Sequence, residues 1–183
     1  MKIRILIITI LILTIGYGQS QDFNAQEPVL ITCAGQSSDV LMAKILAGKA
    51  SLNFVFDKNA KAAQVDSVKS VIIVTGGSVK GMGAAGIDKE QEYNRVKEII
   101  DQAKKQEKKV VCVHVGGKSR RGKLSDFFNK LVADNADMII VVKEGNEEDN
   151  FFTNIAKANK VPIEIPEKII NITDIFKKIY GKE

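Results

Sequence analysis

The chain has 183 residues, of which 45% are hydrophobic and 27% are charged, and its formal net charge is +5. These values are ordinary for one soluble globular domain with a core, and they exclude a low-complexity chain. The lysines alternate with acids, as in KEIIDQAKKQEKK at 97–109, so the positive charge predicts no nucleic-acid stripe.

The N-terminus has the pattern of a targeting segment. Residues 1–4 are basic, residues 5–15 are apolar except for two threonines, and small residues follow at Gly16 and Gly18. The pattern predicts a signal peptide over 1–18, a polar linker over 19–27 and a single α/β domain over 28–183. The alternative is an uncleaved anchor formed by residues 5–16, although a membrane span needs about 20 apolar residues. Either way we expect an exported protein that is secreted or associated with the cell envelope.

Apolar runs and helical spacing alternate along the rest of the chain. Strands are predicted at 28–33, 53–56, 70–75, 110–115, 138–142 and 161–165. Helices are predicted at 40–46, 89–107, 124–133, 151–158 and 172–180. Residues 57–69 are polar and contain at most a short helix. Residues 76–88 and 116–122 are predicted loops.

This alternation predicts a three-layer αβα sandwich with a mainly parallel sheet of five to six strands. A flavodoxin-like strand order, 2-1-3-4-5, is preferred because the second strand is short and the third and fourth are strongly apolar. In that order Cys33 and Cys112 lie two strands apart, about 10 Å, and cannot form a disulfide. The alternative Rossmann-like order would make them neighbours, so a disulfide would contradict the preferred order.

In such sheets ligands bind beyond the carboxyl ends of the strands. The loops predicted there carry glycines, hydroxyl groups and cations, and helix N-termini point to the same edge. Together they favour an anionic ligand such as a carboxylate or a phosphate. The candidate binding residues are Gln36, Ser37, Gly76, Gly77, Ser78, Lys80, Gly81, Gly83, His114, Gly116, Gly117, Arg120, Arg121, Lys143 and Asn146. Structural roles are the alternative: tight turns for the glycines, helix capping for Ser37 and core packing for His114.

Two nucleotide motifs are only superficially present. Residues 81–86 satisfy G-x-G-x-x-G, but five residues separate them from the preceding strand, and no acid ends the following strand. Residues 117–119, GKS, resemble a phosphate loop, but position 112, where that motif requires glycine, is Cys112. We therefore expect no nucleotide cofactor. One histidine and no C-x-x-C pair give no metal site.

Four loop segments together resemble a known family. They are AGQSSD (34–39), GGSVKGMGAAGID (76–88), HVGGKSRRGKLSD (114–126) and KEGN (143–146). In this order they resemble the bacterial family catalogued as the domain of unknown function DUF6305, over residues 28–165. The resemblance implies an exported bacterial protein and supplies no activity. Cys33 departs from the small residue expected before the alanine, which argues against a catalytic cysteine there.

The leading functional hypothesis is therefore an exported protein that binds a small anionic ligand, or an acidic group of an envelope protein. The first alternative is a hydrolase or transferase with His114 as general base and the glycine segment as oxyanion site. The second is a partner-binding accessory domain of the cell envelope. An enzyme is not favoured, no nucleic acid is expected, and membrane contact is expected only through the N-terminal segment.

Overall fold

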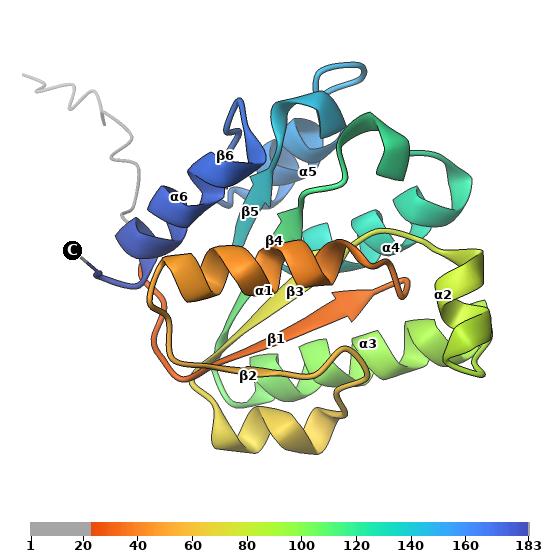
Figure 1. Ribbon diagram of the computed structural model, residues 1–183, viewed down its shortest axis with the longest axis horizontal. Coiled ribbons are helices and arrows are strands. Elements are labelled where there is room, and N and C mark those ends of the chain that lie inside the picture. Colours follow the sequence, from red (N-terminus) through yellow and green to blue (C-terminus); the bar gives the residue numbers. More distant parts are fainter. Residues whose placement is uncertain (1–22, 183) are drawn as a thin grey trace, which may run out of the picture.

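A six-stranded parallel sheet forms the centre of the protein (Figure 1). The computed structural model describes residues 23–182, so the predicted signal segment lies outside the described residues. The sheet order is β2-β1-β3-β4-β5-β6, which confirms the flavodoxin-like order and adds one edge strand. The strands are β1 (Val29–Ala34), β2 (Phe54–Phe56), β3 (Ser70–Thr75), β4 (Lys109–His114), β5 (Met138–Val141) and β6 (Ile163–Glu164).

The strand sequences explain this order. All residues of β1, β3 and β5 are buried, as expected for strands that helices cover on both faces. The two edge strands are short and only partly buried, and Pro162 directly precedes β6. A proline has no N–H for a ladder, so the edge is where it is tolerated.

Helices cover both faces of the sheet. Helices α1 (Asp39–Lys49) and α6 (Ile172–Ile179) share one core with alternate strand residues such as Ile31 and Ile72. Helices α3 (Lys89–Lys105), α4 (Lys123–Ala133) and α5 (Phe151–Asn159) share the other core with Leu30 and Ile73. The short elements are α2 (Val79–Ala84), η1 (Ala62–Ser67), η2 (Gly117–Arg120), η3 (Lys143–Gly145) and η4 (Ile169–Asn171). The three-layer αβα prediction is confirmed.

The two cysteines show why strand order matters. Cys33 on β1 belongs to the core under α1 and α6, whereas Cys112 on β4 belongs to the opposite core. Strand β3 lies between them, and both thiols are free. The predicted absence of a bridge is confirmed, and the side chains also point to opposite faces of the sheet.

Residues 23–27, assigned to the linker by the sequence analysis, contact the domain. The Ala25 N–H donates to the Ile179 carbonyl at 2.8 Å, and Ser70 Oγ donates to the Gln26 carbonyl at 2.6 Å. Every buried residue of the two cores falls between Ala25 and Tyr180. A chain that begins at residue 19 therefore contains the complete packed domain.

Candidate functional site

The loops after β1, β3, β4 and β5 meet at the carboxyl edge of the sheet. The first two are joined by backbone hydrogen bonds, from Gly76 N to Ala34 O at 3.0 Å and from Ser78 N to Gly35 O at 2.8 Å. Gln36 and Gly77 form a further bridge. After β1 the chain passes into α1 on one face, and after β3 it passes into α3 on the other. The β1/β3 boundary is thus the topological switch point, where sheets of this order bind ligands.

The glycine-rich segment contains a short helix, α2, where the sequence predicts only a loop. Ser78 caps this helix, and its Oγ accepts a hydrogen bond from Gly81 N at 2.9 Å. A Cβ on Gly81 would overlap the Gln36 carbonyl oxygen, and one on Gly77 would lie 2.7 Å from Leu124 Cγ. These two glycines therefore permit close contacts within the protein. Gly83 has no such neighbour.

A buried ion pair holds the loop after β1. Glu92, fully buried on α3, accepts from Gly35 N at 2.9 Å and from Gln36 Nε2 at 3.1 Å. Arg95 grips the same carboxylate with two nitrogens, each at 2.8 Å, and donates to the Cys33 carbonyl at 2.6 Å. The Gln36 backbone is left-handed, with φ of 59°. Gln36 thus belongs to a network that fixes the loop, and its Oε1 is buried without a partner among the described residues.

Arg120 extends from the loop after β4 to the start of α1, beside the switch point. Its side chain packs over Gly116 and Gly76, and its Nε donates to Asp39 Oδ2 at 3.0 Å. Asp39 is the first residue of α1, where the helix dipole favours a negative charge. Ser37 is fully buried beside it, and its Oγ accepts from Asp39 N at 3.2 Å. The terminal nitrogens of Arg120 have no hydrogen-bond acceptor within residues 23–182, and 31% of the side chain is exposed.

Arg121 points the other way and is fully engaged. It donates to Asp126 through Nε at 2.7 Å, to Asp149 through Nη2 at 2.8 Å and to the Gly145 carbonyl through Nη1 at 2.8 Å. Further bonds to the same two carboxylates use its remaining donors, and its guanidinium lies 4.6 Å from the centre of the Phe151 ring. These carboxylates, Asp149 first, hold the pKa of Arg121 above its usual range.

His114 is a core residue at the end of β4. It is fully buried, its ring packs on Phe152, and Nε2 lies 3.2 Å from the Gly117 carbonyl oxygen. A carbonyl only accepts, so Nε2 carries the proton, and Nδ1 can accept from Thr75 Oγ1 at 3.4 Å. Burial lowers the pKa of His114. Burial, followed by the charge of Glu92, raises the pKa of Cys33 to about 12. This arrangement provides neither an accessible general base nor a thiolate.

The other predicted residues surround this centre without converging on one point. Lys80 is exposed on α2, and Lys143 is exposed and paired with Glu167 at 2.8 Å. Asn146 is buried and holds the first turn of α5, because its Oδ1 accepts from Thr153 N at 3.1 Å and its Nδ2 donates to Thr153 Oγ1 at 2.8 Å. Gly117 adopts a positive φ of 56° at the start of η2.

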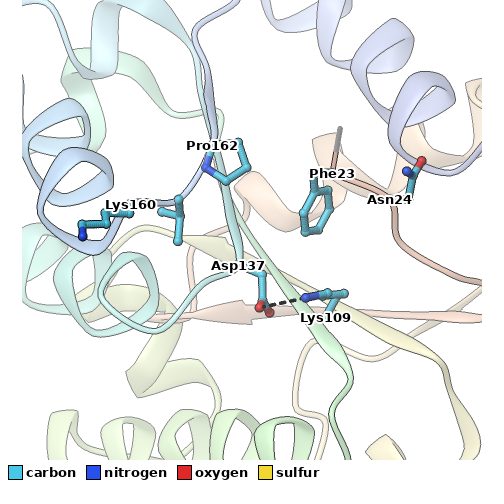
Figure 2. A pocket seen from close by; sticks show the side chains of 7 residues that line it. Phe23, Asn24, Lys109, Asp137, Lys160 and Pro162 are labelled. Carbon is cyan, nitrogen blue, oxygen red and sulfur yellow. Dashed lines mark hydrogen bonds and ion pairs between the residues drawn. The ribbon is translucent and has the colours of Figure 1, made fainter. Parts of the chain in front are cut away.

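Shallow hollows lie at both edges of the sheet. At the carboxyl edge, one of about 300 Å³ lies between the loops after β4 and β5, beside Gly116 and Glu144. Another of about 360 Å³ lies beside Arg121 and Asp149. At the amino edge, a hollow of about 450 Å³ contains the ion pair between Lys109 Nζ and Asp137 Oδ1, at 3.4 Å (Figure 2). Phe23 and Pro162 line that hollow, which the sequence analysis did not anticipate.

Two further properties concern only the part of the chain that the structure describes. Over residues 23–182 no group of histidine, cysteine, aspartate and glutamate side chains could hold a metal ion. Within that same range no helix is both long and apolar enough to cross a membrane.

The sequence analysis missed Glu92, Arg95 and Asp39. Glu92 could have been found, because it is in phase with the buried stripe of α3 at Val96, Ile99 and Ala103. A charged residue at this helical spacing faces the core, so its charge needs a buried partner. Asp39 entered the sequence analysis only as the last residue of the AGQSSD segment, and its partner is 81 positions away.

Comparison with protein families gives a match over most of the chain. The family model described as a domain of unknown function, DUF6305, matches residues 26–180. No curated protein and no solved structure matches the chain. The match covers all six strands and agrees with the resemblance carried by the four loop segments.

Proposed function

We propose that this chain, which belongs to the DUF6305 family, is an exported bacterial binding protein that holds a small anionic group at the β1/β3 switch point. Its export rests on the basic and apolar pattern of residues 1–18. The anion is a carboxylate or a phosphate, either of a small molecule or of an envelope protein.

The observation that carries the proposal is the open side of Arg120. Asp39 fixes the guanidinium through Nε, and neither terminal nitrogen has an acceptor among the described residues. A guanidinium fixed in this way offers two parallel N–H donors, the geometry that a carboxylate or phosphate accepts. Gly76 and Gly116 allow the side chain to lie close to the strand ends.

The ion pair between Arg120 and Asp39 also limits the affinity for an anion. Asp39 neutralises the charge of Arg120, so an incoming anion gains directional hydrogen bonds more than net attraction. We therefore expect selectivity for planar or tetrahedral oxyanions over halides, because halides cannot accept two parallel bonds in the same way.

A thermal-shift screen of residues 19–183 tests the proposal. The panel contains small carboxylates, inorganic phosphate, sugar phosphates and nucleotides, with chloride as the reference anion. A ligand at 100 times its dissociation constant stabilises the fold by about 2.7 kcal/mol, which raises the melting temperature by about 5–10 °C for a domain of this size.

Three variants sharpen the screen. Arg120→Ala should abolish the shift, and Arg120→Lys should retain only part of it because lysine has no fork. Lys130→Ala is the matched control, because Lys130 also pairs with one aspartate, Asp134, but lies on α4. A shift that persists in Arg120→Ala, or a panel in which no anion stabilises the protein, refutes anion binding at the switch point.

A further inference from the structure

Helix α1 is apolar on its solvent side as well as on its buried side. Val40, Ala43, Leu46 and Ala47 face the core, while Leu41, Met42 and Ile45 are 50%, 42% and 53% exposed. At about 100° per residue, Ile45 lies opposite the buried face, with Leu41 and Met42 on either side of it. The outer side of such a helix is normally polar. We call Leu41, Met42 and Ile45 the α1 outer face.

Apart from Asp39, the charged residues of α1 are both lysines. Lys44 lies beside the α1 outer face, Lys49 follows Ile45 by one turn on the same side of the helix, and neither makes an ion pair with any residue in 23–182. Lys44 rests on the Phe56 ring, with Nζ 4.6 Å from the ring centre. Asp39 is the only acid of α1, and Arg120 pairs with it. The helix therefore shows solvent an apolar centre and two ammonium groups that no carboxylate among the described residues neutralises.

We propose that the α1 outer face docks on an anionic lipid surface. The three apolar side chains enter the boundary between headgroups and acyl chains, and the two lysines extend to the lipid phosphates. Binding of a helix at the membrane interface combines buried apolar area with attraction of basic side chains to anionic lipids, and lysine stems can bury their methylene groups while the ammonium stays solvated. Figure 1 shows α1 in front of the sheet, with no other element crossing over it.

The same features argue against a second copy of the chain as the occupant. A twofold contact between two α1 helices would bring four lysines together with no free acid on either helix. Three side chains also fall well short of the roughly 800 Å² per partner that a stable interface buries. An anionic bilayer supplies the opposite charge and needs no matched surface.

Vesicle flotation of residues 19–183 tests the docking surface, because this chain lacks the apolar N-terminal segment. The protein should float with phosphatidylcholine vesicles that contain phosphatidylglycerol, and much less with phosphatidylcholine alone. Lys44→Ala and Lys49→Ala should each weaken binding by about fivefold, since a lysine near an anionic surface contributes about 1 kcal/mol. Ile45→Glu should abolish flotation.

The matched control is Val79→Glu. Val79 is 74% exposed on α2, at the carboxyl edge of the sheet, so the substitution makes a comparable change of charge and polarity away from the α1 outer face. It should float like the unmodified chain. Lys130→Ala should also float normally, because Lys130 lies on α4, which packs on the opposite face of the sheet from α1.

The absence of tryptophan from the sequence allows a direct readout of insertion. Ile45→Trp introduces a single indole, whose emission should shift to shorter wavelength when anionic vesicles are added, whereas Val79→Trp should not respond. Flotation that is equal for both vesicle types, or an Ile45→Trp shift that follows protein concentration without vesicles, overturns the proposal. The second result would indicate a second copy of the chain.

Discussion

Arg120 and Arg121 are neighbours in the sequence and have opposite environments. Arg121 directs all of its donors to protein acceptors: Asp126, Asp149 and the Gly145 carbonyl. Arg120 has one carboxylate partner and keeps its terminal nitrogens open. A closed guanidinium holds loops together, whereas an open one is available to a ligand. Only the open one supports a binding role.

Arg95 extends the comparison into the interior. Like Arg121, it uses every donor on protein acceptors, including the carbonyl oxygens of Ala60 and Cys33. Its partner Glu92 is fully buried, whereas the carboxylates of Arg121 are partly exposed. The three arginines therefore form a series of increasing openness from Arg95 through Arg121 to Arg120. Their substitution costs should follow the same series.

Arg95→Met should produce the largest loss of stability, about 3–5 kcal/mol, because it leaves the Glu92 carboxylate buried without its partner. Urea denaturation measures the loss. The double variant Glu92→Met, Arg95→Met removes both charges and should recover part of it. A double variant that is less stable than Arg95→Met would show that the bonds from Glu92 to Gly35 and Gln36 matter more than the charge pair.

Arg121→Ala should lower the free energy of unfolding by about 2–3 kcal/mol, less than a fully buried pair because Asp149 is half exposed. Arg120→Ala should cost less than about 1 kcal/mol, as is usual for a partly exposed pair. Thermal unfolding of the two alanine variants under identical conditions checks the contrast. Equal losses would mean that Arg120 is as structural as its neighbour.

The glycines of residues 76–88 show a similar contrast, because some have no room for a Cβ atom and others have open space there. Gly81→Ala places a methyl group on the Gln36 carbonyl oxygen and should cost about 1–3 kcal/mol. Gly83→Ala has open space within the same helix, and it should stabilise the protein by about 0.5–1 kcal/mol through the higher helix propensity of alanine. Denaturant titration of both variants distinguishes the two positions. A destabilised Gly83→Ala would point to a requirement for glycine beyond packing.

The contribution of His114 to stability should depend on pH. Burial, aided by the charge of Arg121, keeps the pKa of His114 below the ordinary value of about 6.5. Below about pH 6.5 the unfolded chain therefore binds more protons than the folded one, and the free energy of unfolding falls by up to about 1.4 kcal/mol per pH unit. Above that pH the contribution is constant.

His114→Asn cannot titrate, so its free energy of unfolding should fall less between about pH 7 and pH 5.5 than that of the unmodified chain. Carboxylates contribute to the slope in both proteins and cancel in the difference. Because His114 is the only histidine, a single imidazole signal in NMR reports the same titration. Parallel slopes would show that His114 titrates alike in the folded and unfolded chains, so that folding does not lower its pKa.

The sheet could be predicted because its determinants are local. VIIV at 71–74 and VVCV at 110–113 are continuous apolar runs, and such runs belong to strands covered on both faces. Asp88 and Gln91 form the box that starts α3, a pattern confined to four residues. The short helix α2 was not predicted, because residues 78–85 contain two glycines and a serine, which are poor helix formers. The hydrogen bond from Gly81 N to Ser78 Oγ, which caps this helix, is visible only in the structure.

The sequence by itself determined the alternation of strands and helices, the edge position of the last strand, which Pro162 precedes, and the gathering of glycines and cations at one edge. These follow from hydrophobic period and from the rule that parallel strands end on the same side. Tertiary structure decided which of these cationic side chains keep hydrogen-bond donors without a protein acceptor. Arg120 and Arg121 share the same sequence context, and only the positions of Asp39, Asp126 and Asp149 in space separate an open guanidinium from a closed one. Ion pairing depends on distances of a few ångströms between residues far apart in the chain, and no local pattern encodes those distances.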